Sequence, residues 1–164
     1  PSRAALLAAK LAALLIYTVV FTIVLAVLVA GLSLVCSLIL GIDAGFSLGA
    51  VGDAAWYTVR TILTGLPYLA FAFMLATVAR SNAAGIAGAL GLGFIEAPLF
   101  QLLGVLSDSL QELQKGGLAY NVNLVLLEGL DAREEWIALG ILLLYTALFI
   151  GVTFVVFRRR DITG

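Results

Sequence analysis

Four long apolar runs, separated by segments that hold most of the charges, make up the hydrophobic pattern of this chain. The first has no charged residue from Leu11 to Ile42, which exceeds the ~20 residues that a helix needs to cross the hydrocarbon core of a membrane. This surplus favours a helix that tilts or projects beyond the bilayer. The pattern predicts four transmembrane helices, at residues 11–40, 54–79, 83–106 and 136–157.

The loop between the third and fourth predicted spans, residues 107–135, is long and only partly polar. Its run LAYNVNLVLLEGL, residues 118–130, is too short to cross a membrane and too apolar for a solvated loop. We therefore expect a short re-entrant or interfacial helix there, near the outer membrane face. The predicted fold class is all-α: a polytopic membrane helix bundle in which residues 1–164 form one transmembrane domain.

Two residues are candidate caps at the ends of the predicted helices. Asp53 stands just before the second span, and Ser81 stands in a tight turn before the third. Both are residue types whose side-chain oxygen accepts a backbone N–H at the start of a helix. Asn82 is an alternative cap for the third span.

The composition agrees with an integral membrane protein. The chain is 63% hydrophobic and 12% charged, whereas soluble domains are about 45–50% apolar and about 25% charged. It begins at Pro1, so we expect a piece of a longer chain. Histidine is absent, which removes most catalytic bases and most transition-metal sites. We predict no cofactor, no metal site and no nucleic-acid partner, and we expect the lone cysteine, Cys36, to pack in its apolar run.

Positive charges are distributed unequally between the two sides of the predicted bundle. The side with both termini carries Arg3, Lys10, Arg80 and Arg158 to Arg160, and the other side carries Lys115 and Arg133. Because cytoplasmic segments are enriched in Lys and Arg, this predicts that both termini are cytoplasmic. The expected location is the plasma membrane, in a prokaryote the inner or cell membrane.

A glycine-rich stretch from Arg80 to Gln101 opens the third span. Small residues recur four apart along it, a spacing that lets two membrane helices approach closely. The predicted helix packing face consists of four glycines, Gly85, Gly88, Gly91 and Gly93.

Glu96 and Arg60 are the ionisable residues that fall within predicted spans. A charge at membrane depth is costly and usually faces a protein interior or an aqueous path. One hypothesis is a structural pair of opposite charges that fixes the second helix against the third. Another is that Glu96 faces the substrate path. Arg60 has a further alternative, because its long side chain can snorkel to the headgroups.

The sequence contains no complete motif of the three enzyme or nucleotide-binding classes considered. Glu134 and Glu135 resemble the paired glutamates of intramembrane metalloproteases, but the chain has no histidine and the following span has no charge. The run GIAGALGLGF lacks the strand and the acidic partner of a nucleotide-binding loop. No Walker-type lysine motif is present. We therefore expect a transport or scaffold module with no catalytic residue and no ATP-binding motif of its own.

The order of these features resembles the ABC type 2 permeases, the membrane subunits of ATP-driven exporters. PSRAALLAAKLAALL is similar to the segment after their coupling helix, and LTGLPYLAFAFMLATVARSNAAGIAGALGLGF is similar to their fourth and fifth spans. LLYTALFIGVTFVVFRRRDI resembles their closing helix and basic tail. The resemblance covers nearly the whole chain, through loose motifs in the right order.

The resemblance implies that the chain is the third to sixth helix of a six-helix permease. It implies a second permease, identical or not, and an ATP-binding cassette ATPase subunit that docks near Arg3 and Lys10. It also implies short re-entrant helices in the last outer loop. Two alternatives remain: a membrane scaffold or assembly protein that uses the small-residue face, and an ion-coupled carrier that uses Glu96.

Overall fold

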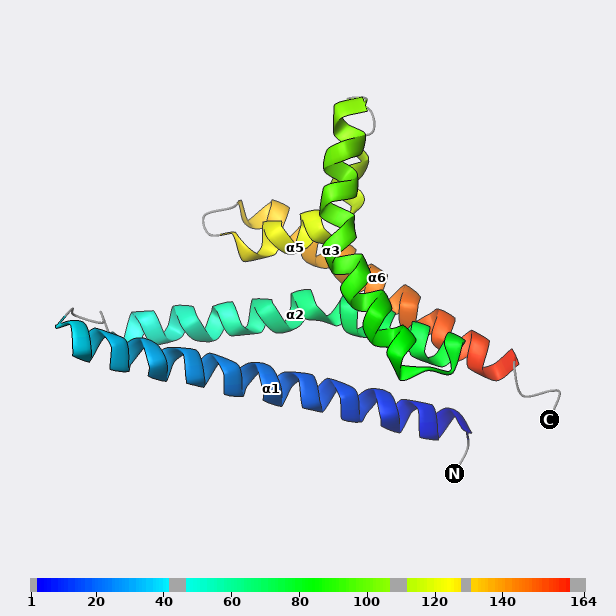
Figure 1. The fold of residues 1–164 in the computed structure, drawn as a ribbon, viewed down its shortest axis with the longest axis horizontal. Coiled ribbons are helices and arrows are strands. Elements are labelled where there is room, and N and C mark those ends of the chain that lie inside the picture. The colour runs from blue at the N-terminus through cyan, green and yellow to red at the C-terminus, as the bar shows by residue number, and fades with distance from the viewer. Residues whose placement is uncertain (1–2, 42–46, 107–111, 128–130, 160–164) are drawn as a thin grey trace. The chain divides into compact units, whose positions relative to one another are not determined.

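The computed structural model describes residues 3–41, 47–106, 112–127 and 131–159. Across these residues the chain is helical apart from short turns, and it contains no β-strand, which confirms the all-α fold class (Figure 1). In chain order the elements are α1 (Arg3–Leu40), α2 (Leu48–Ala79), α3 (Asn82–Leu106), the 3-10 helix η1 (Gln114–Gly116), α5 (Leu118–Leu126) and α6 (Ala132–Arg159).

The helices α1, α2, α3 and α6 are each long and apolar enough to cross a membrane. They confirm the predicted order of spans, and the chain is a multi-pass membrane protein. The helices α1, α2 and α6 each begin several residues before the predicted span starts at residues 11, 54 and 136, so where each helix enters the membrane stays a prediction. Hydropathy marks where a helix becomes apolar, whereas α1 and α6 already begin in segments with charged residues, Arg3 and Lys10 in α1 and Arg133 to Glu135 in α6, that are good helix formers.

Ser47, and not Asp53, caps the amino end of α2. Its hydroxyl accepts a hydrogen bond from the N–H of Ala50 at 3.1 Å, and its carbonyl accepts one from the N–H of Val51 at 3.1 Å. Asp53 lies inside α2, in its second turn. The prediction was wrong because it placed the helix start where the apolar run begins.

The tight turn between α2 and α3 depends on two adjacent residues. Arg80 has a φ of 54°, a left-handed conformation that is uncommon for a residue other than glycine. The N–H of Ser81 then donates to the carbonyl of Ala76 at 3.1 Å and closes the end of α2. The Ser81 hydroxyl accepts the N–H of Ala84 at 3.3 Å, which confirms Ser81 as the cap of α3.

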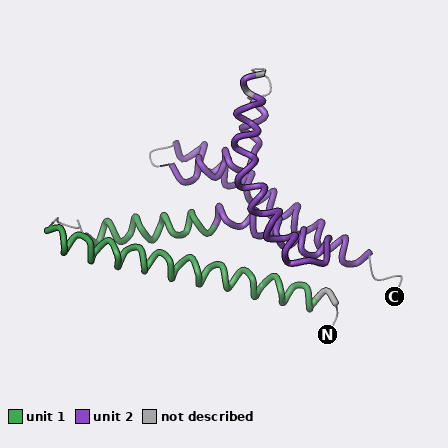
Figure 2. The backbone as a smooth tube through the Cα atoms, in the orientation of Figure 1, with its two compact units in different colours: residues 1, 5–62 green, residues 2–4, 63–164 purple. Residues whose placement is uncertain are grey.

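The chain forms two compact units, and their boundary falls within α2 (Figure 2). The first comprises residues 1 and 5–62, and the second comprises residues 2–4 and 63–164. In the first unit, α1 and the beginning of α2 line a groove whose walls are almost wholly apolar. The second unit contains the polar groups from which the candidate site is built.

The core of the second unit lies where α5 packs against α6. The residues of this core are Leu118, Val125, Ala138, Leu139 and Leu142. The helix α5 also contacts α3, so it lies against two of the long helices. The short helix predicted over 118–130 is therefore present over Leu118–Leu126, while residues 128–130 lie outside the described part of the chain. Its depth in the membrane stays a prediction.

Candidate functional site

Glu96, on α3, holds the amino end of α5. The residue is only 9% exposed, and one carboxylate oxygen accepts a hydrogen bond from the backbone N–H of Leu118. The other oxygen, Oε2, accepts the N–H of Ala119 at 3.1 Å. The first N–H groups of a helix have no partner within the helix, and they carry its positive dipole end. A carboxylate from a neighbouring helix therefore satisfies both the hydrogen bonds and the charge.

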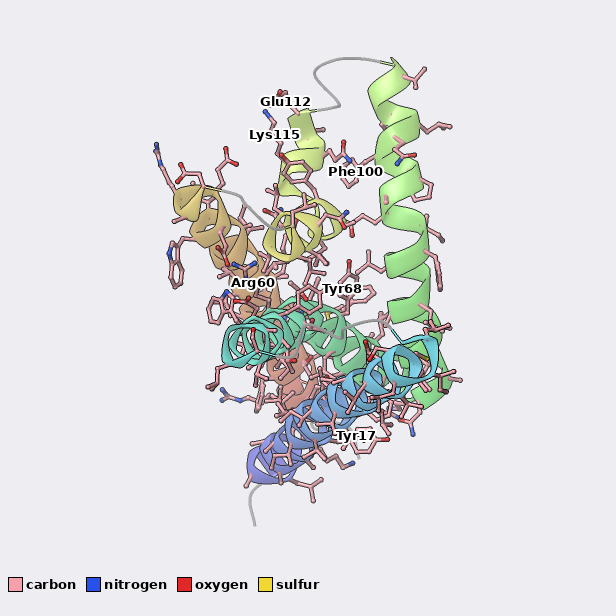
Figure 3. All side chains as sticks on the ribbon, turned by 90° about the vertical axis from the view of Figure 1, so that its left-hand side faces the viewer. Tyr17, Arg60, Tyr68, Phe100, Glu112 and Lys115 are labelled. Carbon is pink, nitrogen blue, oxygen red and sulfur yellow. The ribbon has the colours of Figure 1, made fainter. Side chains whose placement is uncertain are left out.

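Gly117 makes this approach possible. A Cβ atom at this position would lie 2.8 Å from Oε1 of Glu96 and 3.0 Å from the ring of Phe100. Figure 3 shows Phe100 on α3, on the side of that helix where η1 and α5 lie. Gly117 has a φ of −72°, which any residue adopts, so the requirement for glycine here is one of space.

Two further side chains bind the carbonyl groups of the same turn. Asn121 is 1% exposed, and its amide donates to the carbonyl of Lys115 at 2.9 Å and to that of Gly117 at 2.7 Å. The hydroxyl of Tyr145, on α6, donates to the carbonyl of Gly116 at 3.0 Å. We call Glu96, Gly117, Asn121 and Tyr145 the α5 cap, because together they fix the turn from which α5 starts.

A cavity of about 490 Å³ lies beside the α5 cap. Its walls come from α2, α3, α5 and α6, all within the second unit. Most of the lining is aliphatic or aromatic, and Glu96 is the acidic residue among the described residues that line it. The lining includes Phe71, Gly91, Glu96, Phe100, Tyr145 and Phe149.

The four glycines of the predicted packing face have different surroundings. A Cβ on Gly85 would lie 2.7 Å from the backbone oxygen of Ala72 in α2, and one on Gly88 would lie 2.0 Å from the side chain of Leu75. A Cβ on Gly93 would make an ordinary contact of 3.8 Å with the ring of Tyr68. Gly91 has open space on its Cβ side and borders the cavity. The closest approach of α3 to α2 is thus at Gly85 and Gly88.

Arg60 and Glu96 belong to different units, so their predicted pairing stays a prediction. The guanidinium of Arg60 lies over the ring of Trp56, with its carbon 5.4 Å from the ring centre. This is a distance at which a cation is attracted to an aromatic face. Glu96 is held by backbone N–H groups, a kind of partner that the sequence analysis did not consider.

The remaining predicted site residues lie on exposed surface or have no described side chain. Lys10 is exposed on α1, and Arg3 is described only as the first residue of that helix.

Near η1, Lys115 donates to Glu112 at 2.9 Å, an exposed pair that Figure 3 labels. This hydrogen bond and the charge of Glu112 raise the pKa of Lys115 above its usual 10.5. Among the described residues, no cluster of His, Cys, Asp and Glu could hold a metal ion.

Asn121, Tyr145 and Gly117 were missed by reasoning from the sequence. The sequence showed a break at Gly116-Gly117 before the short apolar run, but not that Gly117 would lie against Glu96. Asn121 stands four residues after Gly117, the spacing at which a helical side chain reaches back to a carbonyl. Tyr145 is 29 positions from the carbonyl it binds, a distance that no local pattern reveals.

The fold and the site together define an all-α membrane protein with a buried carboxylate cap on a short helix between its last two spans. No family model, curated protein or solved structure matches this chain. A more specific assignment therefore depends on the architecture itself.

Proposed function

We propose that this chain is part of the permease subunit of an ATP-binding cassette exporter, the membrane part through which substrate passes. The observation that carries the proposal is α5, a short helix placed between the last two spans. The resemblance described above implies short helices at that point of the chain. The face of α5 formed by Leu118, Asn121 and Val125 is buried, so α5 is an integral part of the bundle.

The scaffold alternative has less support, because the closest-packed glycines are already used within the chain. Gly85 and Gly88 lie against α2. A small-residue face that is covered internally is not free to bind a partner. The scaffold would need another surface.

The ion-coupled carrier has less support for a similar reason. Both carboxylate oxygens of Glu96 accept hydrogen bonds from α5. An ion-coupled cycle through this carboxylate would release the start of α5 at each turnover. A permanent cap on a helix is better explained as part of a permease whose energy comes from a separate ATPase.

The proposal includes the expected partners and orientation. An ATP-binding cassette ATPase docks on the cytoplasmic side near Arg3 and Lys10, and a second permease, identical or different, completes the path. Both termini of this chain are cytoplasmic, in the plasma membrane, or inner membrane, of a prokaryote. ATP-driven closure of the ATPase subunits would then switch access to the path from one side to the other.

Site-directed cross-linking tests this proposal. The sole cysteine, Cys36, is replaced by alanine, and one new cysteine is introduced at position 10 or, as a matched control, at position 115. Both native lysines are exposed. A photoactivatable cross-linker is attached in native membranes, and ATPase subunits are labelled with azido-ATP. We expect Lys10→Cys, but not Lys115→Cys, to form an adduct with an azido-ATP-labelled chain.

Two results would count against the proposal. An adduct from Lys115→Cys alone would place the ATPase on the wrong side and overturn the orientation. The absence of a nucleotide-labelled adduct from Lys10→Cys, with equal cross-linker incorporation at both positions, would remove the ATPase partner and favour the scaffold alternative.

A further inference from the structure

The α5 cap uses only part of the hydrogen-bonding capacity and charge of Glu96. The residue is more than nine-tenths buried and borders the cavity. Two N–H groups occupy two of the about four acceptor positions of a carboxylate. A helix amino terminus offsets about half of one negative charge. Among the described residues, neither Lys nor Arg lines the cavity, so the rest of the charge of Glu96 has no cationic side chain beside it there.

Four aromatic side chains line the same cavity. Phe71 comes from α2, Phe100 from α3, and Tyr145 and Phe149 from α6. The ring centres of Phe71 and Phe149 are 5.1 Å apart, and those of Tyr145 and Phe149 are 5.9 Å apart. The faces of aromatic rings attract cations, and groups of such rings recognise quaternary ammonium ligands.

We propose that this cavity binds a lipophilic organic cation, a compact apolar molecule with a quaternary or delocalised positive charge. An anion would meet the carboxylate of Glu96, and a neutral molecule would leave that charge unbalanced. The volume of about 490 Å³ lies within the ~300–1,000 Å³ of small-molecule sites. Most of a two-chain phospholipid would lie outside it. The inference rests on the proposed exporter function and gives that exporter a substrate class.

Two probes of the same shape and opposite charge test the inference. The purified chain in a neutral detergent is titrated by calorimetry with tetraphenylphosphonium and, in a separate experiment, with tetraphenylborate. We expect saturable binding of the phosphonium at least ~10-fold tighter than that of the borate, because desolvated cation–π contacts and the carboxylate favour only the cation. Equal binding of the two ions, or no binding of the phosphonium, would overturn the proposal.

A variant that fills the cavity locates the site without disturbing the α5 cap. Gly91 has open space where its Cβ would be, so Gly91→Leu places a side chain in the cavity. Gly140→Leu is the matched control, because Gly140 also has open space but does not line the cavity. We expect Gly91→Leu to weaken phosphonium binding at least ~10-fold by steric exclusion, and Gly140→Leu to bind as the native chain does. Native affinity in Gly91→Leu would place the binding elsewhere and refute the inference.

Phe149→Leu tests the aromatic contribution. It removes one ring and keeps an apolar side chain of similar size. We expect a loss of ~5- to 30-fold for the phosphonium and little change for the borate, since only the cation interacts with the ring face. An equal loss for both ions would show that the ring contributes packing alone and would overturn the aromatic recognition.

Competition with a short-chain phosphatidylcholine separates a free cation from a lipid headgroup. Displacement of the phosphonium by this lipid at equal concentration would identify a choline site and refute the small-molecule occupant. No ATPase subunit is present in these assays. The binding site and the exporter function can therefore fail independently, because the cross-linking experiment tests only the ATPase partner.

Discussion

Replacing Glu96 with alanine should release the amino end of α5. The substitution removes the acceptor for the N–H groups of Leu118 and Ala119, both at the start of a helix packed between α3 and α6. Glu96→Gln is the milder change, because a glutamine offers one carbonyl oxygen to the two donors and turns its amide toward the other. The expected order of stability is therefore native, then Glu96→Gln, then Glu96→Ala.

The size of the effect follows from the number of donors left unpaired. A buried hydrogen-bond donor without a partner costs ~1–3 kcal/mol of stability. Glu96→Ala leaves two such donors without an acceptor, the N–H groups of Leu118 and Ala119. Two effects reduce this loss. Water can enter from the adjacent cavity and bind the unpaired N–H groups, and the variant no longer has to bury a charged carboxylate. We expect ~2–4 kcal/mol for Glu96→Ala and ~1–2 kcal/mol for Glu96→Gln. Each 1.4 kcal/mol changes an opening equilibrium about tenfold.

Hydrogen exchange of the α5 amides measures this opening directly. In detergent or nanodiscs, the amides of Leu118 and Ala119 should exchange at least ~10-fold faster in Glu96→Ala than in the native chain. The control is Glu112→Gln, which removes a carboxylate from an exposed pair with Lys115. It should change the stability by at most ~1 kcal/mol. Unchanged exchange at both amides in Glu96→Ala would refute the cap and with it the structural role of Glu96.

Three further predictions concern thermal unfolding of the purified protein. Gly117→Ala should destabilise the protein by ~1–3 kcal/mol, because the added methyl group has no room. Gly116→Ala is the control: it has open space beside it and should change the stability by less than ~0.5 kcal/mol. Equal effects of the two substitutions would contradict the close approach of Gly117 to α3. Gly85→Ala should destabilise by a similar ~1–3 kcal/mol, while Gly91→Ala should stabilise by up to ~1 kcal/mol through helix propensity; the reverse order would contradict the packing of α3 on α2. Tyr145→Phe should cost ~0.5–1.5 kcal/mol for its hydrogen bond, and no loss would show that α6 does not hold the turn.

The number and order of long helices could be predicted from the sequence because both follow from local properties. An apolar run of span length indicates a membrane helix whatever surrounds it. Ser81 was also predictable, since a cap acts within one turn of its own residue. The start of α2 was not, because the prediction tied the helix start to Asp53 at the edge of the apolar run. Ser47 caps the helix before that edge.

The candidate site was predictable only in part, because its contacts join distant parts of the chain. Glu96 was recognised as unusual from its position in an apolar run. Its hydrogen bonds reach residues 22 and 23 positions away, and the sequence does not reveal that proximity. The glycine face shows the same limit. Residues spaced four apart indicate a close helix contact, but only the structure shows that Gly85 and Gly88 make it while Gly91 borders a cavity.

Glu96 is compensated by a helix end and not by a charged side chain, so the charged residues of the spans do not reveal its partner. A buried carboxylate needs compensation, and the sequence offers Arg60 as the opposite charge in a predicted span. A helix amino terminus also supplies compensation, through N–H groups that already lack partners and through its dipole. The helix α5 provides such a terminus inside the bundle, and it follows Gly117, whose lack of a side chain lets α3 approach. Because a helix end carries only partial charge, part of the negative charge of Glu96 is left uncompensated, and under the proposal above the same residue that fixes α5 attracts the cation.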